Sequence, residues 1–168
     1  MIETGELFTI AQIAVALAGF SAIIGVLGSR ASRSDVRVDS LRLQVMLESG
    51  LMVAAFALLP ALVSRFGFAT HTSWRIASAV FLLISIPFEF LVRSRTKSMP
   101  DMTLTRLNIN TINWCLSLGA DLIMLVVLLG LVGSRAGAFY LLGIFALLIM
   151  TGLLFVQFAA STFVPSEQ

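Results

Sequence analysis

The chain has 168 residues, of which 58% are hydrophobic and only 12% are charged. Soluble domains carry about 25% charged residues, so this composition cannot cover a water-facing surface and indicates an integral membrane protein. With one histidine, His71, and one cysteine, Cys115, the chain can form neither an internal disulfide nor a cluster of histidine metal ligands. We therefore expect no cofactor and no bound metal.

Five apolar segments follow one another along the chain, each close to the roughly 20 residues that a helix needs to cross a bilayer. They span about residues 7–27, 43–63, 74–92, 107–132 and 139–163. No polar stretch between them is long enough to fold by itself. The sequence therefore predicts an all-α bundle of five transmembrane helices that forms a single domain over residues 1–168. No lysine or arginine precedes the first segment, which argues against a signal peptide.

Small residues recur at helical spacing along one face of the first segment. Small side chains let two helix backbones approach closely in lipid, so this face predicts a packing seam, either within the bundle or between subunits. Gln12 and Gly19 lie on a neighbouring face. The seam residues are Ala14, Ala18, Ala22 and Gly25.

Basic residues are distributed unevenly between the loops. The loops at 29–42 and 93–106 hold eight of the eleven lysines and arginines. Because basic loops stay in the cytoplasm, we expect an external N-terminus and a cytoplasmic C-terminus. The same charges suit anionic lipid headgroups, and we expect no nucleic-acid partner. A bacterial inner membrane is the expected location.

The second and third segments each carry polar residues inside an apolar run. Gln44 and Glu48 lie four residues apart near the start of the second segment, and Pro60 lies near its end. The carbonyl that Pro60 leaves without a donor is expected to be satisfied locally, with a kink there. In the third segment, Ser85 and Glu89 share one helical face.

The fourth segment carries a polar stripe over its first half. Arg106, Asn110, Asn113, Ser117 and Asp121 recur at steps of four, three, four and four, which places them on one helical face. The same face continues with apolar residues as far as the turn expected at 133–137. These apolar residues are Met124, Leu128 and Leu131.

Asp121 is expected near the middle of the bilayer, where a carboxylate is costly and must face protein or water. No lysine or arginine lies within three turns of it on its own segment. Protonation, a bound cation or contact with water would each resolve this cost.

Two interpretations fit the polar residues, nearly all of which fall in the cytoplasmic leaflet. In the first, they line a water-filled vestibule that favours cations and is closed by a hydrophobic gate at Met124, Leu128 and Leu131. In the second, Glu48 and Glu89 pair with interfacial arginines, and the amide and hydroxyl groups only join helices. The vestibule would be lined by Asp121, Ser117, Asn113, Asn110, Glu48, Glu89 and Gln157.

Two stretches resemble motifs of intramembrane proteases. Gly19-Phe20-Ser21-Ala22 resembles the start of the rhomboid serine motif, but that chemistry needs a histidine base and His71 lies in a loop. Leu118-Gly119-Ala120-Asp121 is loosely similar to the presenilin-type aspartyl motif, which needs a second carboxyl group. Glu48 and Glu89 are expected nearer the membrane surface than Asp121. We therefore do not expect an enzyme.

The sequence thus predicts a channel or transport subunit that is permissive for protons or monovalent cations and associates with copies of itself. The alternative is a non-conducting membrane protein that acts as a scaffold or regulator, or binds lipid.

Overall fold

A computed structural model describes the backbone of residues 5–31, 36–97 and 104–163, and the side chains of 5–26, 43–92, 94, 111–156 and 159. Five long helices make up nearly all of these ranges, which contain no strand. Each helix is long and apolar enough to cross a membrane, which confirms the predicted all-helical chain with five apolar segments. The helices are α1 (Gly5–Ala31), α2 (Val36–Ser64), α3 (Thr70–Lys97), α4 (Leu104–Leu128) and α5 (Ala136–Phe163).

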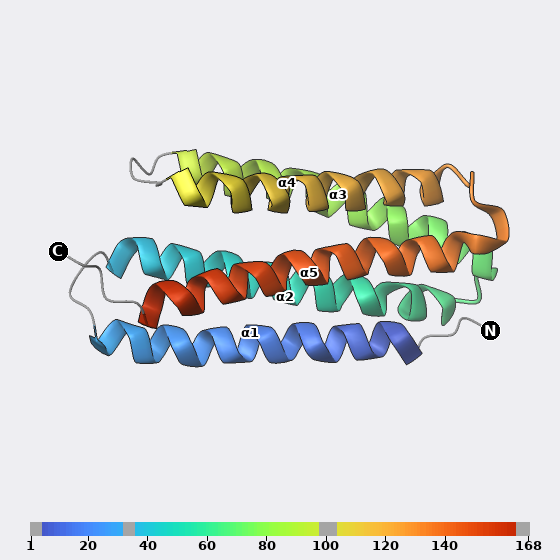
Figure 1. Ribbon diagram of the computed structural model, residues 1–168. Coiled ribbons are helices and arrows are strands. Elements are labelled where there is room, and N and C mark those ends of the chain that lie inside the picture. Colours follow the sequence, from blue (N-terminus) through green and yellow to red (C-terminus); the bar gives the residue numbers. More distant parts are fainter. Residues whose placement is uncertain (1–4, 32–35, 98–103, 164–168) are drawn as a thin grey trace.

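The five helices run antiparallel in chain order and form an elongated bundle (Figure 1). α2 and α5 lie in the middle, with α1 along one edge and the α3–α4 pair along the other. α3 and α4 lie close to the middle helices at the end near the α4–α5 turn, and they diverge from them toward the opposite end. Gly5 and Phe163 therefore lie at opposite ends of the bundle.

The small-residue face of α1 packs against α2. Ala14 has no exposed surface, and a Cβ atom added to Gly50 would lie 3.2 Å from the Cβ of Ala18 and 3.3 Å from the carbonyl oxygen of Ala14. A Cβ on Gly25 would likewise overlap the side chain of Leu43. The structure thus places this face inside the bundle, where glycine and alanine allow the two backbones to approach.

α4 ends at Leu128, four residues before the predicted end of its segment. Gly130 adopts a left-handed conformation with φ of 76°, and the N–H of Leu131 donates to the carbonyl of Val126 at 3.3 Å. These are features of a glycine-terminated helix end. Arg75 of α3 also donates its Nε–H to the Leu128 carbonyl at 2.8 Å, where the helix dipole favours a cation. The short 3₁₀ helix η1 (Gly133–Arg135) then leads into α5.

Pro60 in α2 leaves the carbonyl four residues earlier, that of Phe56, without its usual helical donor. The hydroxyl group of Tyr140 in α5 donates to this carbonyl at 2.8 Å. Tyr140 is fully buried and packs against Trp74, with 5.3 Å between ring centroids. The expectation of a local solution is therefore wrong, because the donor comes from another helix and joins α2 to α5.

Replacing Tyr140 with phenylalanine should lower the free energy of unfolding by about 1–2 kcal/mol, because a buried carbonyl then has no donor. Pro60→Ala supplies a backbone N–H to the same carbonyl. In the Pro60→Ala background, Tyr140→Phe should therefore cost clearly less. Equilibrium unfolding of the four proteins in detergent–lipid mixtures measures the difference, and equal costs in both backgrounds would contradict this role for Tyr140.

Candidate functional site

Two serine–acid pairs face each other across α3 and α4. Ser85 and Glu89 lie one turn apart on α3, and Ser117 and Asp121 lie one turn apart on α4. Because the two helices are antiparallel, the serine of each helix is level with the acid of the other. The Ser85 hydroxyl donates to Oδ1 of Asp121 at 2.8 Å, and the Ser117 hydroxyl donates to Oε1 of Glu89. We call these four residues the carboxyl site.

These two hydrogen bonds bring the carboxyl groups of Glu89 and Asp121 close together across α3 and α4. A hydrogen bond between two carboxyl groups requires a proton on one of them, because an ionised carboxylate only accepts. No ion pair joins Asp121 to a lysine or arginine among the described side chains. The site is therefore a carboxyl pair with hydroxyl donors and without a described countercharge.

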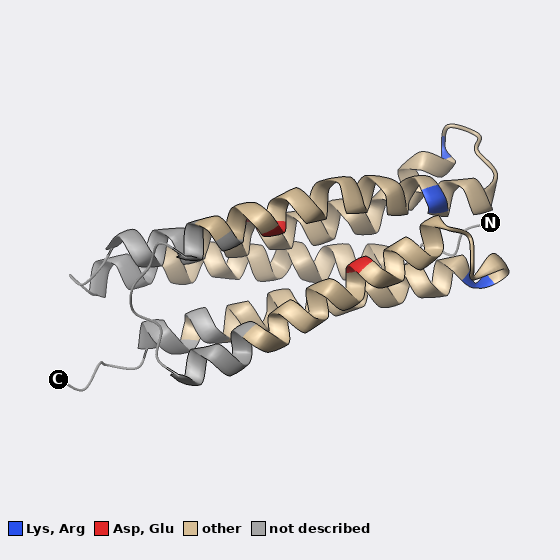
Figure 2. Ribbon diagram, turned by 90° about the horizontal axis from the view of Figure 1, so that it is seen from above, with Lys and Arg blue, Asp and Glu red and all other residues tan. Residues whose placement is uncertain are grey.

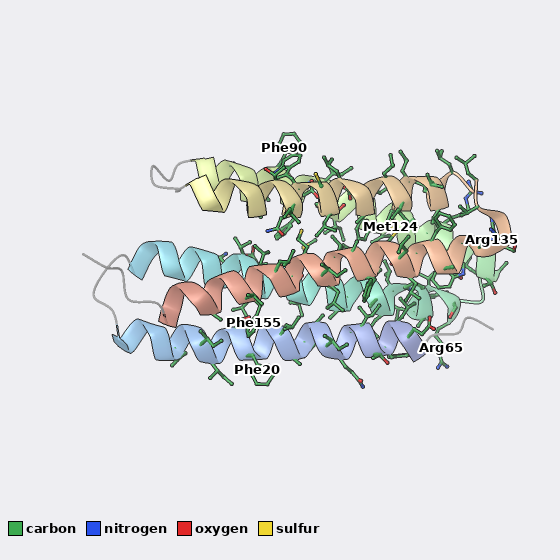
Figure 3. All side chains as sticks on the ribbon, in the orientation of Figure 1. Phe20, Arg65, Phe90, Met124, Arg135 and Phe155 are labelled. Atoms are coloured by element: carbon green, nitrogen blue, oxygen red, sulfur yellow. The ribbon has the colours of Figure 1, made fainter. Side chains whose placement is uncertain are left out.

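The carboxyl site lies at the edge of a tightly packed apolar layer. Ser85 is buried, whereas Glu89, Ser117 and Asp121 are half-buried. One turn from Ser85 and Asp121, Phe81 and Met124 have no exposed surface. Figure 3 shows Met124 pointing from α4 into the bundle, whereas Phe90 points away from it. The apolar layer thus covers the site on the side of the α4–α5 turn.

Asn113 lies one turn before Ser117 on the same face of α4. Its Oδ1 atom is buried and has no hydrogen-bond partner. A buried acceptor without a donor costs about 1–3 kcal/mol, so this atom has an unmet demand for a proton donor, a cation or water. It extends the polar stripe of α4 by one turn beyond the carboxyl site.

The other predicted site residues are placed as follows. Glu48 accepts a hydrogen bond from Nε2 of Gln44 at 2.6 Å, one turn away on α2. Leu128 is half-buried at the end of α4, and Leu131 is 73% exposed in the turn that follows. The side chains of Asn110 and Gln157, and those of Arg42, Arg93 and Arg106, lie outside the described residues.

Along the bundle, Glu89 lies level with Ser117, one turn nearer the Lys97 end of α3 than Asp121. Glu89 was expected nearer the membrane surface than Asp121, which argued against a second carboxyl group beside Asp121. The order along the bundle agrees with this expectation, but one helical turn is too little to separate the two acids, so the argument against a second carboxyl group near Asp121 is wrong. Ser85 was missing from the predicted site, although the spacing Ser-x-x-x-acid recurs in both segments and could have identified it.

The arginines whose side chains are described all lie at one end of the bundle. Arg65, Arg75 and Arg135 gather at the end where α1 begins, and Glu6 lies there too (Figure 2). The other acidic residues with described side chains, Glu48, Glu89 and Asp121, lie part-way along the helices. Arg65 and Arg135 are both seen at this end in Figure 3. Among the described side chains, no group of three His, Cys, Asp or Glu could hold a metal ion. The chemistry that the site offers is therefore that of two carboxyl groups and two hydroxyl groups.

Comparison of the chain with models of known protein families, with curated proteins and with solved structures finds no match.

Replacing Ser85 with alanine should destabilise the protein by about 0.5–2 kcal/mol, and it should cost less when Asp121 is already leucine, because the acceptor is then absent. Ser21→Ala is the matched control. Ser21 is equally buried, but its hydroxyl donates only to the Leu17 carbonyl of its own helix. Unfolding free energies of the single and double variants measure the coupling. A coupling between Ser85 and Asp121 no larger than that between Ser21 and Asp121 would contradict the cross-helix bond.

Proposed function

We propose that the chain is an integral membrane protein that conducts or transports protons, or a monovalent cation that takes the place of a proton. The observation that carries this proposal is the carboxyl pair of Glu89 and Asp121, held between two apolar helices with hydroxyl donors on both sides. Ionisable residues inside membrane spans are rare, and they typically mark ion pathways and proton relays.

Insertion in the membrane is supported by the five apolar helices. In this proposal the loops at 29–42 and 93–106, which hold eight of the eleven basic residues, face the cytoplasm. The N-terminus then lies outside and the C-terminus inside. The arginines gathered at the opposite end of the bundle mark the outer interface (Figure 2).

The carboxyl pair is suited to exchanging a proton because its two acids cannot both ionise readily at close range. One proton satisfies the pair, and its departure leaves two negative charges facing each other. A small monovalent cation could replace that proton, since carboxylate, hydroxyl and amide oxygens are hard ligands. Ser85 and Ser117 keep one donor on each acid in either state.

The path to the pair from the cytoplasmic side follows α4. Asn113 and Ser117 lie one turn apart and lead to Asp121, and the Asn113 acceptor is without a partner. α3 and α4 diverge from α2 and α5 in this direction (Figure 1). Beyond Asp121, α4 continues for roughly 10 Å to its end at Leu128. Apolar side chains, beginning with the fully buried Met124, close the path over this length. This stretch would act as the gate, because a narrow apolar constriction stays dry until the helices separate.

A lipid-binding role is the second candidate. An open groove of about 410 Å³ lies between α1 and α5, away from the carboxyl site. It is lined mostly by apolar residues and bordered by Glu6 and Thr9. An acyl chain would fit such a surface, and its binding would require no proton transfer at the carboxyl site. The two functions differ in whether the carboxyl pair is needed.

Proton flux into liposomes that contain the purified protein tests the first proposal. A pH-sensitive dye inside the vesicles reports flux under a pH gradient or an imposed voltage. Asp121→Asn and Glu89→Gln should each lower the flux at least about tenfold, because each removes one exchangeable carboxyl group while keeping its shape; tenfold corresponds to about 1.4 kcal/mol in the barrier. Replacing the external cation shows whether the carried species is a proton or a metal ion.

Glu6→Gln is the matched control, since it removes one carboxylate from an exposed position at the start of α1. It should leave the flux unchanged. Flux that survives Asp121→Leu would remove this residue from the path. If the native protein shows no proton flux under any gradient, and Asp121→Leu folds as well as the native chain, the lipid-binding alternative is favoured.

A further inference from the structure

Six serine and threonine residues are buried in the described part of the bundle, and two of them differ from the rest. Four donate to a backbone carbonyl of their own helix, which is a common partner for a hydroxyl group inside a helix. Ser78 and Ser85 of α3 instead donate to side chains of α4. The four that donate within their own helix are Ser21, Ser49, Ser73 and Thr151.

The hydroxyl group of Ser78 has a weak acceptor. It donates to Sδ of Met124 at 3.7 Å, and a thioether sulfur accepts hydrogen bonds only weakly. Neither Ser78 nor Met124 has any exposed surface, and Phe81 and Val127 nearby on the same two helices are equally closed to solvent. A hydroxyl group in such an apolar layer is costly unless it has a strong partner, so packing alone does not account for Ser78.

Ser78 lies on the face of α3 that meets α4, between the carboxyl site and the end of the bundle where Arg75 lies. Seven residues separate Ser78 from Ser85, which corresponds to roughly 10 Å along the helix. Three residues in the other direction, Arg75 reaches the Leu128 carbonyl at the end of α4. Ser78 therefore divides the distance between the carboxyl site and this end of the bundle into two shorter steps.

The side chain that covers Ser78 is able to move. Methionine is unbranched and has three rotatable bonds, so it adapts to the space around it. Met124 points from α4 into the bundle (Figure 3), and its terminal methyl group lies where α5 has a glycine. A Cβ atom added to Gly143 would lie 2.7 Å from Cε of Met124. A change of rotamer at Met124 would leave room for water beside Ser78.

We propose that Ser78 relays the proton across the apolar layer, and that Met124 is the plug that keeps water away from Ser78 in the closed state. When Met124 moves aside, water enters between Asp121 and Ser78, and the carboxyl pair releases its proton to this water. The Ser78 hydroxyl group accepts a proton from the water on its inner side and donates its own proton to water on its outer side, so its oxygen gains no charge. This inference rests on the proposed function and identifies the residue that serves the outward half of the path.

Cysteine labelling tests for water at Ser78 without any measurement of flux. In a Cys115→Ser background, Ser78→Cys is nearly isosteric, and Ala77→Cys places a thiol at the same depth on a neighbouring, equally buried face of α3. A small methanethiosulfonate in the external solution reacts with the thiolate, which forms only where water reaches the thiol. Under an imposed pH gradient, Ser78→Cys should react at least about tenfold faster than Ala77→Cys. Equal rates, or no reaction at either position, would overturn the proposal.

Variants of Met124 test the plug in the Ser78→Cys protein. Met124→Ala should raise the labelling rate at least about threefold, because removal of the side chain leaves room for water. Met124→Leu keeps the apolar bulk and should leave the rate close to that of the parent. A labelling rate that Met124→Ala does not raise would contradict the assignment of the plug.

Proton flux into liposomes separates this inference from the proposed function. Ser78→Ala should lower the flux at least about fivefold. Ser73→Ala should leave it unchanged, since Ser73 is an equally buried serine of α3 that donates to the Ala69 carbonyl of its own helix. A native flux that Asp121→Asn abolishes and Ser78→Ala leaves intact would overturn the relay and retain the proposed function. A native chain without proton flux would overturn both.

Discussion

Polar groups placed among apolar helices must find their hydrogen-bond partners inside the protein, and this constraint organises the bundle. The Phe56 carbonyl, released by Pro60, takes its donor from Tyr140 on another helix. Arg75 reaches from α3 to the open end of α4. Ser85 and Ser117 cross between α3 and α4. In each case one polar contact fixes how two helices are aligned, while apolar packing supplies the bulk of the cohesion.

The same constraint separates the polar groups that only join helices from those of the carboxyl site. Tyr140 is fully buried, and its hydroxyl group donates one hydrogen bond to the Phe56 carbonyl, which lacks its helical donor. Glu89 and Asp121 together present four oxygen atoms, to which the two serines supply two donors. The Asn113 acceptor nearby has none. A region with more acceptors than donors retains a demand for a proton, a cation or water, and this excess is what supports the proposed exchange of a proton at the site.

The elements of the fold follow from short-range features of the sequence, whereas the carboxyl site does not. Segment length and hydropathy predicted five helices, and spacing by fours placed Ser117 and Asp121 on one face. Neither feature gives the relative depth of two helices. Glu89 was expected nearer the surface than Asp121, and only the pairing of α3 with α4 shows that the difference is a single turn, which leaves the two acids close together. The end of α4 depended on the left-handed Gly130, which hydropathy does not detect. Tyr140 had no spacing pattern at all, since its partner is a backbone carbonyl on another helix.

The positions of α1 and the carboxyl site bear on where a proton path would run. α1 lies along one edge of the bundle and the α3–α4 pair along the other, with α2 and α5 between them (Figure 1). The carboxyl site therefore lies away from α1, between the two helices of the opposite edge. The small inner face of α1 is filled by its packing against α2, where Gly50 and Ala14 lie in close contact, so it offers no polar route through the bundle. The proposed proton path must then run beside α3 and α4, where serine and asparagine side chains lead to the two acids, while α1 contributes to the stability of the bundle.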